Sequence, residues 1–89
     1  MSDATLATPG ALIGDALEQR GLTLDDLAQS TRLRRGLLEQ MEADDFADTG
    51  GDVYARGHLR VIAGVLDIDP GVMLAAYDEA PGVRRPPAP

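Results

Sequence analysis

Few residue types in this 89-residue chain could support catalysis or bind a metal. Cysteine is absent and His58 is the single histidine, which excludes thiolate chemistry and histidine-rich metal sites. No carboxylate lies at helical spacing from His58 to orient it as a general base, because Asp52 is six residues away. The acidic segment before it lacks the spacing and the closing glutamate of an EF-hand calcium loop; its aspartates are Asp44, Asp45, Asp48 and Asp52. We therefore expect no enzyme activity, no metal and no cofactor.

Three arginines and a glutamine have the types and spacing needed to contact nucleic acid. Arg32, Arg34 and Arg35 lie within four positions, and Gln40 follows. In a helix-turn-helix, side chains near the start of the second helix contact phosphates and base edges. However, residues 39–52 carry six acids and no base, and the net charge is −7, which opposes phosphate binding. The same arginines also fit a solvated face on which Arg35 pairs with Glu39 one turn later, so both interpretations stay open.

Another candidate site follows from residues 53–66, which are typical of one helix with two apolar stripes. The first stripe has the spacing of a core-facing side; it consists of Ala55, Leu59, Ile62, Ala63 and Leu66. The second consists of Tyr54, His58, Val61 and Val65. A small domain usually buries one stripe per helix, so the second stripe either packs on a neighbouring helix or docks a partner. Tyrosine and arginine are enriched in interface hot spots, which makes Tyr54, with Arg56 and Arg60 nearby, a candidate partner contact.

Local sequence signals predict the helices that would position these side chains. Thr8 and Gly21 are a start and a stop for the first helix. Thr23 and Asp26 resemble a capping box at the start of the second. The five predicted helices cover residues 9–20, 23–30, 33–43, 53–66 and from 70 onward. Because no strand signal is present, we predict an all-α domain, a compact five-helix bundle that contains a helix-turn-helix.

Composition indicates how this bundle is filled. An apolar fraction of 44% suits a folded core, and three aromatics among 89 residues make that core mainly aliphatic. Phe46 is expected to plug the core from the acidic loop, and Val72 to pack from the fifth helix. Gly57 is expected to mark the close approach of another backbone. The chain then divides into a disordered N-terminus, the folded domain and a proline-rich tail or linker that adds nothing to the core, over residues 1–8, 9–80 and 81–89.

The second and third predicted helices resemble the Xre/lambda-repressor-like helix-turn-helix pattern in the segment GLTLDDLAQSTRLRRGLLEQMEADDF. With the segment VYARGHLRVIAGVLDIDP, they resemble the N-terminal cytoplasmic domain of the RodZ family of bacterial cell-shape proteins. This resemblance implies a domain that chiefly binds protein, joined by a flexible linker to a transmembrane helix, with the actin-like filament protein MreB as its partner. The family's filament-contacting aromatic positions correspond to Tyr54 and His58, and its basic positions to Arg56 and Arg60.

Two functions are therefore weighed. In the first, the fourth helix docks on an MreB-type filament or another envelope protein, with Tyr54 and His58 in the contact and Val61 and Val65 extending it. Arg56 and Arg60 would lie at its rim. In the alternative, the chain is a DNA-binding regulator that uses the basic and amide side chains already named, Arg32, Arg34, Arg35 and Gln40. The chain itself is expected to be cytoplasmic and to reach the membrane only through segments beyond it.

Overall fold

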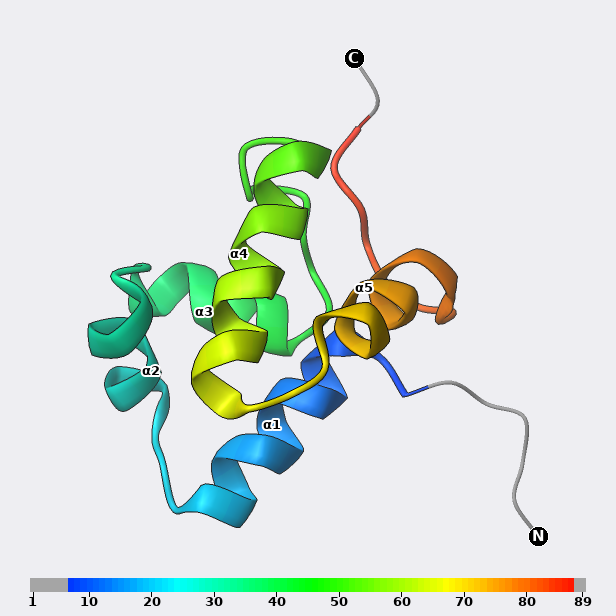
Figure 1. Ribbon diagram of the computed structural model, residues 1–89. Coiled ribbons are helices and arrows are strands. Elements are labelled where there is room, and N and C mark those ends of the chain that lie inside the picture. The colour runs from blue at the N-terminus through cyan, green and yellow to red at the C-terminus, as the bar shows by residue number, and fades with distance from the viewer. Residues whose placement is uncertain (1–6, 88–89) are drawn as a thin grey trace, which may run out of the picture.

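The computed structural model describes residues 7–87, and within this range the chain forms five α-helices and no strand (Figure 1). The helices are α1 (Pro9–Arg20), α2 (Leu24–Thr31), α3 (Arg35–Glu42), α4 (Asp52–Leu66) and α5 (Pro70–Glu79). This confirms the predicted all-α five-helix bundle. None of these helices combines the length and hydrophobicity that a membrane span requires. The predicted disorder at the N-terminus falls mostly on residues 1–6, outside the described range.

Side-chain caps explain where the first two helices begin. The Thr8 hydroxyl accepts a hydrogen bond from the Ala11 amide at 3.0 Å, and α1 ends at a left-handed Gly21. At α2, the amide of Thr23 donates to the Asp26 carboxylate at 2.9 Å, and the amide of Asp26 donates to the Thr23 hydroxyl at 3.1 Å. The predicted capping box is therefore present, with both bonds formed.

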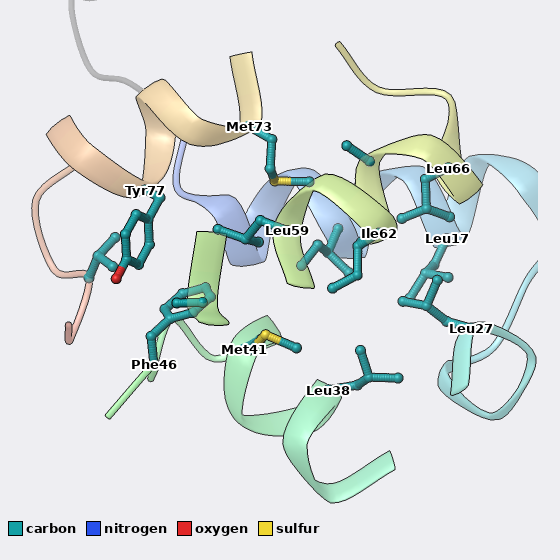
Figure 2. Close-up of a cluster of buried hydrophobic side chains, with 14 of the residues drawn as sticks. Leu17, Leu27, Leu38, Met41, Phe46, Leu59, Ile62, Leu66, Met73 and Tyr77 are labelled. Atoms are coloured by element: carbon teal, nitrogen blue, oxygen red, sulfur yellow. The ribbon is translucent and has the colours of Figure 1, made fainter. Parts of the chain in front are cut away.

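Helix α4 lies at the centre of the molecule, with α2 and α3 on one side and α5 on the other (Figure 1). The whole of its predicted core-facing stripe is buried, with each residue at most 1% exposed. Figure 2 shows Leu59 and Ile62 of α4 among side chains from the other helices; these include Leu17, Leu27, Leu38, Met41 and Met73. A single core is therefore organised around one side of α4.

Two aromatic rings close this core at the end where α4 begins. Phe46, from the loop between α3 and α4, and Tyr77, from α5, are both fully buried. Their ring centroids lie 5.1 Å apart in an edge-to-face arrangement, visible side by side in Figure 2. The prediction that Phe46 plugs the core from the acidic loop is confirmed.

The C-terminal segment (residues 81–87) departs from its prediction as a tail outside the core. Val83 is buried with 8% exposure and belongs to the core cluster. The Phe46 amide donates to the carbonyl of Arg84 at 2.7 Å, and the Arg84 amide donates to the carbonyl of Asp44 at 2.8 Å. These backbone bonds attach the segment to the α3–α4 loop. Local sequence patterns did not predict these bonds, because Arg84 lies about forty residues from Asp44 and Phe46 along the chain.

Two further expectations are wrong. Val72 is 53% exposed on α5 and does not pack in the core. A Cβ atom added at Gly57 would meet nothing within 4 Å, so this glycine marks no close approach. The close approach occurs at Gly10 instead, where a Cβ would lie 2.1 Å from the carbonyl oxygen of Glu42. The amide of Gly10 also donates to the Asp44 carboxylate at 2.7 Å, which joins the start of α1 to the loop that follows α3.

These two glycines make a matched pair. Gly10→Ala is expected to lower the free energy of unfolding by about 1–3 kcal/mol, because a backbone atom must move to admit the methyl group. Gly57→Ala is expected to raise it by about 0.5–1 kcal/mol, because alanine is favoured over glycine inside a helix and the added Cβ atom meets nothing within 4 Å. Urea denaturation followed by circular dichroism measures both. Equal effects at the two positions would contradict the close contact at Gly10.

Candidate functional site

The outer side of α4 carries an apolar surface. Val53 is 78% exposed, Tyr54 62% and Val61 48%, while His58 and Val65 are half-buried. Of the predicted second stripe, Tyr54 and Val61 thus face solvent, and Val65 packs partly against the core cluster. We call Val53, Tyr54, His58, Arg60, Val61 and Val65 the α4 face.

Val53 was missed by the sequence analysis, although it is the most exposed large apolar residue of the described chain. It stands outside the second stripe because it does not share the helical spacing of Tyr54 and Val61. Its neighbour Asp52 opens the helix, so Val53 occupies the first turn, where little of the bundle covers it. Inspection of the apolar residues in the first turn of each predicted helix, in addition to helical spacing, would have found it.

Arg56 joins α4 to α5. Its Nε donates to the Asp52 carboxylate at 2.8 Å, and its guanidinium forms two hydrogen bonds with the carboxylate of Asp78, one of them at 3.2 Å. The guanidinium also lies 5.3 Å from the centre of the Tyr77 ring. The hydrogen bonds that Arg56 donates to Asp78 and Asp52 raise the pKa of Arg56 above its usual value. All of these contacts of Arg56 are within the molecule, and its role at the rim of a partner contact stays a prediction.

Asp52 and Tyr77 form the polar end of this contact. The Tyr77 hydroxyl donates to Asp52 Oδ1 at 2.9 Å. The hydrogen bonds from Arg56 and then Tyr77 hold the pKa of Asp52 below its usual value, because they favour the ionised carboxylate. Burial, followed by the bond to Asp52, raises the pKa of Tyr77 to about 12. Tyr77 is therefore a neutral donor at physiological pH. The four-residue spacing of Asp52 and Arg56 was the available sequence signal for this network.

The arginines of the helix-turn-helix differ in their contacts within the molecule. Arg35 pairs with Asp25 at 3.0 Å and with Glu39 at 3.1 Å, which confirms the predicted pairing with Glu39. Arg32 closes α2 in a left-handed conformation, and Arg34 is an exposed residue at the start of α3.

The amide group of Gln40 donates to the Asp48 carboxylate at 3.3 Å. Arg34 and Gln40 share a surface hollow of about 380 Å³ with Asp48. Two of the four predicted DNA contacts are thus bound within the molecule. Gln40 is held by the acidic loop, and Arg35 is held by Asp25 and Glu39. In residues 7–87 no three acidic or histidine side chains gather as a metal site.

Two short helices, α2 and α3, joined by residues 32–34, define the class of this protein as a helix-turn-helix domain. A family model described as "Helix-turn-helix domain" matches residues 16–73, and the chain belongs to that family. Its similarity to relatives makes it a RodZ-like member of the class.

The cytoskeleton protein RodZ of Streptococcus pneumoniae is 35% identical over 78 residues, or 88% of this chain. The chain spans 28% of the length of that relative. A solved structure of YmfM from Staphylococcus aureus, described as a candidate DNA-binding membrane protein, is also similar, with a TM-score of 0.74 and 32% identity. That match covers 84% of this chain and 93% of the YmfM chain. The Xre-like bundle predicted from the sequence is therefore confirmed.

The network at Asp52 has a pH dependence of definite sign. Because the native pKa of Asp52 lies below its unfolded value of 3.8, the ionised carboxylate stabilises the fold at higher pH, and this contribution is lost as pH falls through the native pKa. The difference in free energy of unfolding between the wild type and Asp52→Asn is expected to be largest above about pH 5 and to shrink towards pH 2. Denaturant titrations at several pH values measure it.

Asp15→Asn is the matched control, because this exposed carboxylate has no hydrogen bond or ion pair among the described residues. Its difference from the wild type is expected to stay small and constant with pH. A difference for Asp52→Asn that is independent of pH would contradict the assigned network.

Proposed function

We propose that this domain is the protein-interaction module of a RodZ-like cell-shape protein and docks its α4 face on an actin-like filament of the MreB type. The observation that carries this proposal is the exposure of apolar side chains on one helix. Of the four large apolar residues exposed in residues 7–87, three belong to α4. They are Val53, Tyr54 and Val61.

The chemistry of the α4 face suits protein docking. Tyr54 has a large apolar ring and a polar hydroxyl, a combination that favours interface hot spots. Val61 and the half-buried His58 and Val65 extend the contact along the helix. Arg60 is exposed at the margin, where a charge chiefly affects the association rate and its salt dependence. Arg56 would contact a partner from the position in which Asp52 and Asp78 hold it.

The relatives support the same setting. RodZ is named a cytoskeleton protein, and YmfM is described as a membrane protein. In the RodZ resemblance, the filament-contacting positions fall on Tyr54 and His58, the first two members of the second stripe. We propose that the chain works at the cytoplasmic face of the membrane as part of a longer protein.

Tyr54→Ala is expected to weaken binding to the host's purified actin-like filament protein by about tenfold or more, because it removes the largest exposed apolar side chain of the face. The free energy of unfolding should change by less than about 0.5 kcal/mol, because the side chain is exposed. Titration of the ¹⁵N-labelled domain should broaden the amide signals of residues 53–65. Cosedimentation with filaments gives the affinity.

Val72→Ala is the matched control, since Val72 is also a large apolar residue, 53% exposed, but lies on α5. It should leave the affinity unchanged. Unfolding of Tyr54→Ala would show that Tyr54 has a structural role, and an unchanged ¹⁵N spectrum of the wild type would refute the filament proposal.

DNA binding is the second candidate function, favoured by the description of YmfM as a candidate DNA-binding protein. Arg32 and Arg34 are exposed near the start of α3, where a recognition helix would contact DNA. Arg35 and Gln40 are held by carboxylates, which would have to be displaced.

A titration with duplex DNA, monitored at residues 32–40, tests this candidate. We expect weak binding that Arg34→Ala reduces for every DNA sequence. Binding should disappear at about 200 mM salt, because a few phosphate contacts are strongly salt-dependent. Tight, sequence-dependent binding that survives this salt concentration would make the DNA-binding regulator the better proposal.

A further inference from the structure

The C-terminal segment and the start of α4 form the two walls of a groove. Figure 1 shows the segment running beside the first turns of α4. The groove has a volume of about 500 Å³, within the range of sites that enclose a ligand group. Its apolar walls come from α4 and from the end of the segment, with a glycine loop between them; the residues are Val53, Tyr54, Pro86, Pro87, Gly50 and Gly51.

The second wall is fixed to the domain. The backbone of Arg84 makes two hydrogen bonds with the α3–α4 loop, and Val83 is inserted in the core. The guanidinium of Arg85 donates to the carbonyl of Tyr77 and lies 5.6 Å from the centre of that ring. Two prolines follow, whose ring closure restricts their backbone. The groove therefore exists before any partner binds, which lowers the conformational cost of filling it.

Two charged side chains, Asp52 and Arg85, also line the groove. Asp52 accepts hydrogen bonds from Arg56 and Tyr77, and Arg56 is also paired with Asp78. Arg85 donates to carbonyl oxygens and lies near Asp52, whose pKa it helps to lower. The carboxylate of Asp52 is therefore already paired, whereas Arg85 makes no ion pair within residues 7–87 and is held by two carbonyl oxygens. Because the exposed guanidinium of Arg85 can stay in solvent and the rest of the lining apart from Asp52 is apolar or glycine, the groove suits an uncharged apolar side chain.

We infer that this groove receives an apolar anchor side chain, such as leucine or phenylalanine, from the same filament partner that covers the α4 face. The inference rests on the proposed function. Tyr54 carries it, because this residue belongs both to the α4 face and to the groove, which makes the two surfaces continuous. An apolar side chain inserted in a pocket beside an exposed tyrosine has the arrangement of an interface hot spot.

The C-terminal segment is then part of the docking surface and not merely its connection to the rest of the protein. The partner binds the domain when the C-terminal segment is attached to the α3–α4 loop. Attachment of the segment therefore strengthens partner binding, and partner binding stabilises the attachment by the same factor. The amide hydrogens of Phe46 and Arg84, which form the attaching bonds, report this coupling directly.

The double variant Pro86→Ser/Pro87→Ser tests the inference in the complete 89-residue domain, with the purified filament protein as the probe. It removes one apolar wall but keeps Val83, both Arg84 bonds and Arg85. Val53→Ser alters the opposite wall. Each is expected to weaken binding about fivefold to tenfold with an unchanged melting temperature. Pro81→Ser, in the same segment but outside the groove, is the control and should bind like the wild type. Hydrogen exchange at the Phe46 and Arg84 amides should slow in the complex.

The outcomes separate the two proposals. Weaker binding by Tyr54→Ala and by both groove variants, with slowed exchange, supports the anchor. Weaker binding by Tyr54→Ala alone, with groove variants within twofold of the wild type, overturns the anchor and leaves the filament proposal standing. Equal losses from Pro81→Ser and the double proline variant also overturn it, because the effect would then come from the segment's stiffness. Absence of wild-type binding refutes the proposed function, and the anchor with it.

Discussion

The buried ring of Tyr77 is the contact on which four parts of the molecule converge. It belongs to α5, packs edge-to-face on Phe46 from the loop, and bonds to Asp52 at the start of α4. Its main-chain carbonyl accepts from Arg85 of the C-terminal segment. A buried hydroxyl is costly unless it is paired, so burying this ring requires a hydrogen-bond acceptor, which Asp52 at the first turn of α4 provides. The start of α4 is therefore determined by tertiary contacts, since its N-cap, Gly51, provides no side-chain cap.

This anchoring determines which way α4 presents its side chains. With Asp52 and Arg56 turned towards α5 and Leu59 in the core, helical geometry directs Tyr54 and Val61 to the opposite side. Their exposure is thus a consequence of the Tyr77 contact and not of a poorly packed helix. The same contact brings the C-terminal segment beside the exposed first turn. One buried aromatic residue consequently positions both the α4 face and the wall of the neighbouring groove.

The sequence was a good guide where local physics decides the structure. Helix α1, the capping box of Thr23 and Asp26, and the buried stripe of α4 follow from propensity, capping and periodicity, each of which acts within a few residues. It was a poor guide where distant segments meet. The burial of Val83 and the close approach at Gly10 depend on contacts with the end of α3 and the α3–α4 loop, which no local sequence pattern predicts. For the candidate site, periodicity found Tyr54 and Val61, whereas Val53 required knowledge of what covers the first turn.

Charge placement gives α4 and α3 different capacities within one fold. Residues 53–66 carry arginine but no acid, although the chain as a whole has a net charge of −7. Helix α3 is instead followed by acids, and Arg35 is paired with two of its neighbours. Phosphate contact through Arg35 would have to break two existing ion pairs, whereas apolar contact at Tyr54 or Val61 breaks none. A helix-turn-helix fold does not by itself fix a DNA-binding function. This physical difference between the two helices supports the proposal that α4 recognises the partner.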